Sequence, residues 1–105
     1  MALPRLTHLQ FLVLAALLKG DARGRDLRDR LGKAGVRQSG PAFYQMMAGL
    51  EDGGMVSGWY VQQVLDGQIF RERHYKALSD GRKAWKESRD FYARAVRTVA
   101  QPREA

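Results

Sequence analysis

The chain has 105 residues, which fits a single domain with a modest hydrophobic core. It has no cysteine, so disulfides and thiolate chemistry are excluded, and its two histidines, His8 and His74, are widely separated, so neither a metal site nor a cofactor is expected. A formal net charge of +7 favours a polyanionic partner such as nucleic acid, although a basic surface can also serve solubility alone.

The first apolar run predicts a buried helix over residues 7–19. Thr7 and Gln10 have the spacing of a capping box, and a helix that is apolar nearly all round must be covered on several sides. Arg5 followed by apolar residues resembles a secretion signal, but the run is too short to span a bilayer and lacks a small-residue cleavage site. We therefore expect a cytoplasmic protein without a membrane segment.

A second helix is predicted over residues 23–32, with Leu27 and Leu31 facing inward. Its first residues, Arg23 and Arg25, can clamp DNA phosphates or can form local ion pairs on a solvated helix. A flexible basic turn over residues 32–38 follows.

Residues 39–52 predict a capped helix that leads into a strand. Ser39 can act as N-cap, Pro41 is tolerated in the first turn, and Gly53-Gly54 supply the stop. The apolar positions that recur at helical spacing are Phe43, Met46, Met47 and Leu50. Since they bury one face, the other face is free to meet a partner, as in a recognition helix.

Two strand-like runs, residues 55–65 and 68–78, are joined by Asp66-Gly67, the strongest short-range signal for a hairpin. The hairpin would form a wing, and its return strand carries three cations that can lie along a phosphate backbone or simply be solvated: Arg71, Arg73 and Lys76. Its apolar tip, residues 61–70, suits contact with a protein surface better than insertion into a minor groove.

The last helix is predicted over residues 80–100, capped by Ser79 and about 30 Å long. Apolar and aromatic side chains recur along it at three- and four-residue steps, which favours a dimer seam over a ligand pocket. The predicted dimer-interface residues are Trp85, Ser88, Phe91, Tyr92, Ala95 and Val99. Residues 101–105 are expected to form a frayed tail.

The order of these residues resembles the PadR-like family of bacterial transcriptional regulators. The matching positions are Gly40, Phe43-Tyr44, Leu50-Glu51, Gly54-Met55-Val56 and Ser57-Gly58-Trp59. The resemblance covers roughly residues 7–95. It implies an α+β, mostly α fold, with a winged helix-turn-helix domain over residues 1–78 and a C-terminal dimerisation helix and tail over residues 79–105.

The sequence departs from the family pattern at the exit from the wing, where Ser79-Asp80-Gly81 has one residue fewer between the cap and the Gly, and at two places in the helix-turn-helix. Where the second helix of the family opens with Tyr-Gly-Tyr, this chain has Arg23-Gly24-Arg25. Where family members usually carry basic residues, it has Ala48-Gly49, and residues 40–52 contain no Lys or Arg. Any contacts to DNA phosphates must therefore come from the elements that flank this helix.

The resemblance implies a transcriptional regulator that binds double-stranded DNA as a homodimer through the helix at 39–52 and the basic wing. The predicted DNA-binding residues are Arg23, Arg25, Arg37, Gln38, Ser39, Tyr44, Gln45, Arg71, Arg73 and Lys76. Some family members bind a flat aromatic effector at the dimer interface, and Trp85, Phe91 and Tyr92 are the candidates for such a role here.

The alternative function is a winged-helix dimer that acts as a protein-interaction module without sequence-specific DNA binding. The neutral recognition helix and the apolar wing tip favour it. An enzyme is not expected, because the sequence has no nucleophile elbow, no phosphate loop and no paired His and Cys.

Overall fold

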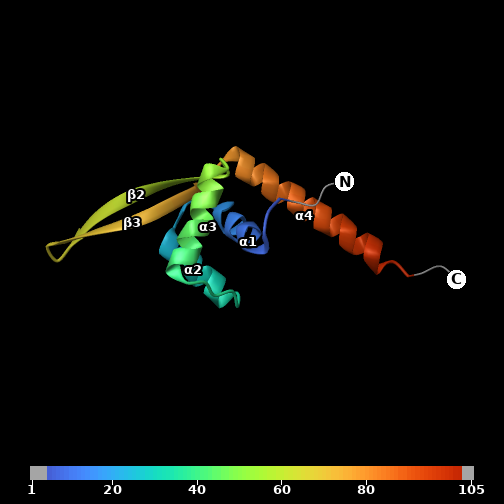
Figure 1. Ribbon diagram of the computed structural model, residues 1–105, viewed down its shortest axis with the longest axis horizontal. Helices are drawn as coiled ribbons and strands as arrows, with labels where there is room; N and C mark the ends of the chain where they lie inside the picture. The colour runs from blue at the N-terminus through green and yellow to red at the C-terminus, as the bar shows by residue number, and fades with distance from the viewer. Residues whose placement is uncertain (1–4, 103–105) are drawn as a thin grey trace.

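The computed structural model describes residues 5–102 as four helices and a three-stranded antiparallel sheet. The helices are α1 (His8–Leu17), α2 (Gly24–Lys33), α3 (Gly40–Asp52) and α4 (Ser79–Ala100). The strands are β1 (Ala22–Arg23), β2 (Val56–Leu65) and β3 (Gln68–Ala77), in the order β1-β3-β2. The predicted fold class, a mostly helical winged helix-turn-helix with a long terminal helix, is confirmed (Figure 1).

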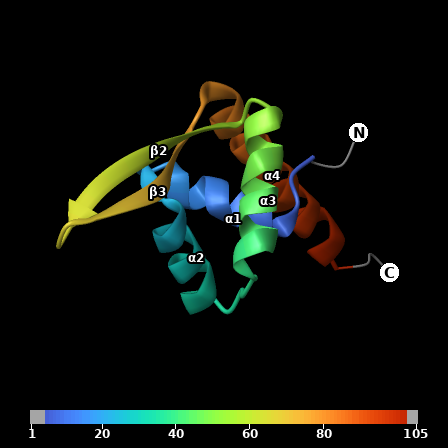
Figure 2. The same ribbon diagram turned by 60° about the vertical axis from the view of Figure 1, so that its left-hand side comes forward.

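Helix α1 forms the centre of the molecule. Its capping box is present: Thr7 Oγ1 accepts from the Gln10 amide at 3.2 Å, and Gln10 Oε1 accepts from the Thr7 amide at 3.0 Å. Val13, Leu14 and Leu17 are fully buried. The helix contacts α2, α4 and β3 and crosses behind α3 in Figure 2. The prediction of a helix covered on several sides is therefore confirmed.

Helices α2 and α3 form the helix-turn-helix. Ser39 caps α3 by accepting a hydrogen bond from the Ala42 amide at 3.2 Å, and Gly54, with φ +72°, follows its end. The side chains that the two helices bury in the core are Leu27, Leu31, Phe43, Met47 and Leu50. This matches the predicted inward faces, with Met46 half-buried beside them.

Strands β2 and β3 form the predicted wing and pair over their whole length, from Val56 with Ala77 to Leu65 with Gln68. The turn has φ +50° at Asp66 and +76° at Gly67, the positive values that a two-residue Asp-Gly hairpin requires. Strand β1 pairs with the base of β3 and was not predicted, because two residues are too few to show an alternating pattern.

Helix α4 begins at Ser79, so the prediction of Ser79 as its N-cap is wrong. Leu78 occupies the N-cap and makes no side-chain capping hydrogen bond. Instead, the Leu78 amide donates to the Met55 carbonyl at 3.0 Å, and Gly81 packs against the same carbonyl one turn later. Arg82 donates to the carbonyl of Leu18 at 3.1 Å. Tertiary contacts to the backbone therefore set the start of α4 in place of a cap.

The wing and α4 extend in opposite directions from the body of α1 to α3 (Figure 1). The principal extents are 73 × 27 × 22 Å, and the radius of gyration is 16.9 Å, against about 13 Å for a compact chain of this length. No helix among residues 5–102 has the length and apolar character needed to cross a membrane. Of the tail predicted at 101–105, residues 103–105 lie outside the described residues.

Candidate nucleic-acid interface

The outer face of α3 is open to solvent and carries no cation. Its exposed residues are Pro41, Ala42, Tyr44, Gln45, Ala48, Gly49 and Asp52. Of the predicted DNA-binding residues in and just before this helix, Ser39, Tyr44 and Gln45 are exposed, whereas Gln38 Oε1 is buried without a hydrogen-bond partner among the described residues. The polar side chains that the middle of α3 presents on this face are therefore those of Tyr44 and Gln45.

Tyr44 packs over α2 as well as facing solvent. A Cβ on Gly24 would lie 2.8 Å from Tyr44 Cε1 and 2.9 Å from its hydroxyl oxygen, so the ring lies directly on that glycine. The ring also packs edge-on against Phe43, with centroids 5.1 Å apart. The glycine that the sequence retains between Arg23 and Arg25 therefore allows α3 to approach α2 closely.

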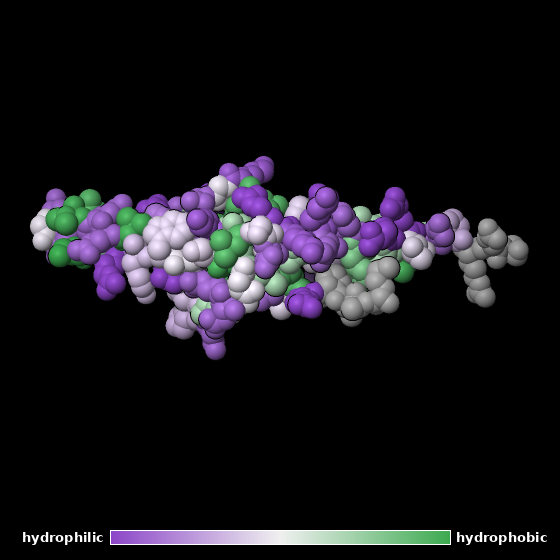
Figure 3. Space-filling view, turned by 90° about the horizontal axis from the view of Figure 1, so that it is seen from above, coloured by the Kyte–Doolittle hydropathy of each residue, from purple (hydrophilic) through white to green (hydrophobic). Residues whose placement is uncertain are grey.

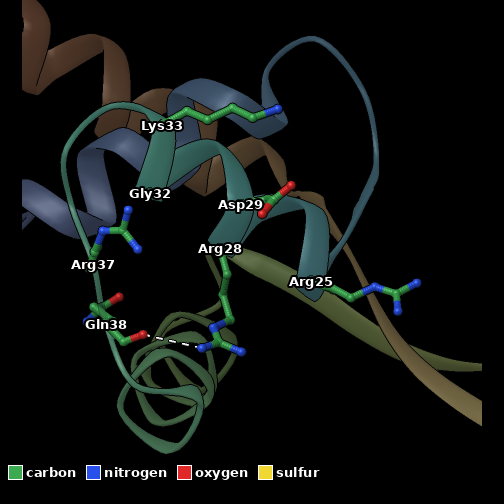
Figure 4. A pocket seen from close by; sticks show the side chains of 7 residues that line it. All are labelled: Arg25, Arg28, Asp29, Gly32, Lys33, Arg37 and Gln38. Carbon is green, nitrogen blue, oxygen red and sulfur yellow. Dashed lines mark hydrogen bonds between the residues drawn. The ribbon is translucent and has the colours of Figure 1, made fainter.

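A basic hollow opens at the turn between α2 and α3. Figure 4 shows Arg28 directed from α2 toward the loop before α3, where its Nη2 donates to the backbone oxygen of Gln38 at 3.3 Å. Arg37 faces the same hollow from the loop, while Arg25 and Lys33 point outward from the two ends of α2. Arg28 and Arg37 thus form a pair of guanidinium groups beside the N-terminus of α3.

A second groove separates α3 from the wing. It is lined by Tyr44, Ala48, Glu51, Tyr60, Arg71, Arg73 and Tyr75. Because neighbouring strand residues point to opposite faces, the cross-strand pairs Tyr60–Arg73 and Gln62–Arg71 share the face that meets α3. Lys76 lies on the other face, opposite Ser57. The three predicted wing cations are therefore divided between two faces.

Arg73 connects the wing to α3 through an ion pair with Glu51. A Cβ on Gly58 would lie 2.5 Å from Glu51 Oε1 and 2.9 Å from Arg73 Nη2, so a larger residue would displace the pair from this position. The same guanidinium lies 5.8 Å from the ring centroid of the buried Tyr75. Burial raises the pKa of Tyr75 to about 12, an effect that the hydrogen bond with Arg73 opposes. Tyr75 is therefore neutral at physiological pH.

Arg23 and Arg25, both predicted to bind phosphate, meet at Glu72 of the wing. Arg23 donates to Glu72 at 3.2 Å and to Asp26 at 3.0 Å, and Arg25 donates to Glu72 at 2.8 Å. The hydrogen bond from Arg23 holds the pKa of Asp26 below its ordinary value. Arg25 stays 70% exposed and can also reach a phosphate, whereas Arg23, at 35%, mainly links α2 to β3.

The six predicted dimer-interface residues fall into two groups along α4. Trp85 stacks on Phe11 of α1 with ring centroids 5.4 Å apart, and Ser88 is 2% exposed, so both pack within the chain. Further along, Tyr92 and Val99 are exposed, and Phe91 and Ala95 are half-buried. Of the predicted interface residues, those in the outer half of α4 are therefore the ones left wholly or partly exposed.

The wing tip is the other large apolar surface. Its exposed side chains are Val64, Leu65, Ile69 and Phe70. Figure 3 shows hydrophobic side chains gathered at this end of the molecule. No group of three or more acidic or histidine side chains that could hold a metal ion occurs within residues 5–102.

Three residues that shape these grooves were missing from the predicted site. Arg28 is one of several charged residues on α2, and the sequence around it does not indicate that its side chain turns toward α3. Glu51 was recognised only as part of the family motif, because its ion-pair partner, Arg73, lies 22 residues away in the sequence. Tyr60 belonged to a run of strand-forming residues, but its position opposite Arg73 could have been read from the hairpin register.

No protein-family model matches the sequence, and no curated protein matches it. The solved structures that match its fold include a PadR family regulator from Eggerthella lenta DSM 2243, with 21% identity, 87% of this chain and 77% of that chain covered, and a TM-score of 0.69. A PadR family regulator from Clostridium difficile R20291 has 13% identity, coverage of 90% and 100%, and a TM-score of 0.73.

The structure of Bacillus subtilis PadR in complex with operator DNA matches with 14% identity and a TM-score of 0.64. The match covers 94% of this chain and 51% of that one. At these identities the likeness concerns the fold, and the fold of this chain is PadR-like.

Proposed function

We propose that this chain, whose fold is PadR-like, is a cytoplasmic transcriptional regulator that binds duplex DNA as a homodimer through α3 and the wing. The observation that carries the proposal is the open face of α3, bordered by Arg28 and Arg37 at one end and by Arg71 on the wing side. The net charge of +7 and the operator complex of Bacillus subtilis PadR support it.

Phosphate binding and base reading are divided between different elements in this proposal. Gln45 and Tyr44 contact base edges or the sugar-phosphate backbone from α3, with Ser39 and Gln38 at its N-terminal end. The phosphate contacts come from Arg25, Arg28, Arg37 and Arg71. Arg23 and Arg73 hold the wing against α2 and α3, and Lys76 makes a peripheral contact from the other face of the wing.

The outer half of α4 supplies the proposed dimer seam. Tyr92, Val96 and Val99 are 45%, 59% and 81% exposed on a helix that extends away from the body, and burying such side chains drives association. Residues 79–105 are the proposed dimerisation segment. An apolar groove lined by Leu6, Phe11, Leu12 and Tyr92 lies beside the seam, and it offers a flat aromatic effector a binding place there.

Fluorescence anisotropy with a labelled duplex at about 50 and about 200 mM salt tests the function. The expected result is saturable binding that weakens steeply with salt, in a sample that light scattering identifies as a dimer. Arg28→Ala combined with Arg37→Ala should lower both the affinity and the salt dependence. Lys86→Gln, which removes an exposed charge from α4, should leave both unchanged. Absence of saturable binding at the lower salt concentration would refute the proposal.

A second candidate function is a protein-interaction module, favoured by the exposed side chains of the wing tip. Val64→Ser combined with Ile69→Ser separates the two functions. A protein adaptor would lose its partner with this variant. A DNA-binding regulator would keep its affinity for the duplex, because these side chains lie beyond the basic part of the wing.

A further inference from the structure

Tyr60 holds two guanidinium groups at the groove between α3 and the wing. The guanidinium carbon of Arg71 lies 4.6 Å from the ring centroid of Tyr60, and that of Arg73 lies 4.7 Å from it. Both distances fall within the range of a cation–π interaction. The register explains the arrangement, because Arg73 is the direct cross-strand partner of Tyr60 and Arg71 is its diagonal neighbour on the same face.

The two arginines differ in what else they bind. Arg73 is paired with Glu51, and both side chains of that pair are about three-quarters buried, with 25% and 23% of their surface exposed. Arg71 is exposed, and within residues 5–102 it takes part in no ion pair. The charge of Arg73 is therefore balanced, whereas that of Arg71 remains available to an anion.

We propose that Tyr60 is a positioning residue whose ring holds the Arg71 guanidinium at the mouth of the α3–wing groove, where Arg71 makes the main phosphate contact of the wing. The inference rests on the proposed DNA-binding function and assigns a role in it to one residue, Tyr60. Arg73, bound to Glu51, fixes the angle of the wing so that the Tyr60 ring faces α3.

The chemistry of the side chains supports this division. A flexible arginine loses rotamer freedom when it binds phosphate, and a guanidinium already stacked on a ring has lost part of that freedom beforehand. Tyr60 is 60% exposed, so its ring has no large packing role in the core. Phenylalanine offers the same aromatic face, leucine offers none, and lysine at position 71 keeps the charge but stacks less well.

The test measures duplex affinity and its salt dependence for the wild type, Tyr60→Leu, Tyr60→Phe, Arg71→Ala, Arg71→Lys and the double variant Tyr60→Leu/Arg71→Ala. Tyr60→Leu should weaken binding about 2- to 5-fold per protomer, because exposed cation–π contacts have this magnitude, and the salt slope should not change. Tyr60→Phe should bind as the wild type does. Arg71→Lys should behave like Tyr60→Leu. Arg71→Ala should reduce the salt slope by about 0.9 per protomer.

The double variant separates a positioning role from a structural one. If Tyr60 acts through Arg71, the double variant should bind no more weakly than Arg71→Ala alone. Additive losses would overturn the inference, as would a Tyr60→Leu variant that binds like the wild type or a Tyr60→Phe variant that binds like Tyr60→Leu.

A measurement without DNA distinguishes failure of the inference from failure of the proposed function. The ring current of Tyr60 should shift the Arg71 side-chain protons upfield in NMR spectra of the wild type and of Tyr60→Phe, but not of Tyr60→Leu. A wild type that shows this shift and yet binds no duplex would refute the proposed function and, with it, the role of Arg71. A missing shift in a protein that does bind DNA would refute the inference alone.

Discussion

Replacing Gly81 with alanine should destabilise the protein, although alanine is the better helix former. Gly81 is buried in the first turn of α4, and a Cβ there would lie 2.1 Å from the Met55 carbonyl oxygen and 3.2 Å from Leu14 Cδ2. The Met55 carbonyl is held by its hydrogen bond from the Leu78 amide at 3.0 Å, so it cannot simply turn away. Helix α4 would have to move off the body of the domain.

The expected magnitude follows from two opposing effects. Overpacking a buried position destabilises by about 1–3 kcal/mol, and a clash with backbone belongs at the upper end of that range. Alanine in place of glycine in a helix stabilises by about 1 kcal/mol. We therefore expect Gly81→Ala to lower the free energy of unfolding by about 2 kcal/mol.

Gly49→Ala is the matched control, because Gly49 lies within α3 and has no atom within 4 Å of the added Cβ. It should raise the free energy of unfolding by up to about 1 kcal/mol. Urea unfolding followed by circular dichroism, at one fixed protein concentration, compares the two variants with the wild type. The packing argument fails if Gly81→Ala is as stable as the wild type or if both variants shift in the same direction.

Three further variants test other parts of the molecule. Ala48→Lys adds a cation to the open face of α3 and should steepen the salt dependence of duplex binding by about 0.9 per phosphate reached, as measured by anisotropy; an unchanged slope would mean that this face does not approach DNA. Since the pKa of Tyr75 is raised to about 12 in the folded protein, its contribution to stability is complete below about pH 10, the pKa in the unfolded chain, and is lost as the pH rises toward 12. The free energy of unfolding should therefore fall by up to about 1.4 kcal/mol per pH unit in that window, and urea titrations should find a shallower fall for Tyr75→Phe; equal slopes would contradict the assignment. Val96→Asp places a charge on the outer half of α4 and should weaken the dimer without lowering the helix content. Light scattering should then find monomers at protein concentrations at which the wild type is still a dimer; an unchanged dimer would exclude this face as the seam.

The parts of the fold that the sequence predicted depend on interactions between residues close together in the chain. The Thr7–Gln10 capping box, the Ser39 cap and the Asp66-Gly67 turn each involve two to four consecutive residues, so their geometry follows from local chemistry. The buried face of α3 follows in the same way from helical spacing.

The choice of partner for long charged side chains could not be predicted in this way. Arg23 and Arg25 meet Glu72 across 49 and 47 residues, and only the docking of the wing on α2 brings them together. The start of α4 likewise depends on the carbonyl of Met55, which no pattern near Ser79 indicates. In the site, the sequence identified most of the cations, but the fold determines which of them are paired with carboxylates and which remain available.

The two arms that extend from the body also affect how the protein behaves on a chromatography column. A radius of gyration of 16.9 Å is the value expected for a compact protein of roughly 210 residues, which is twice the length of this chain. Because an elongated molecule has a larger hydrodynamic radius than a compact one of equal mass, a single copy should elute from a gel-filtration column ahead of globular standards of its own mass. Elution volume alone would overestimate the mass of one molecule, so the number of copies has to be determined from a quantity that measures mass and not size.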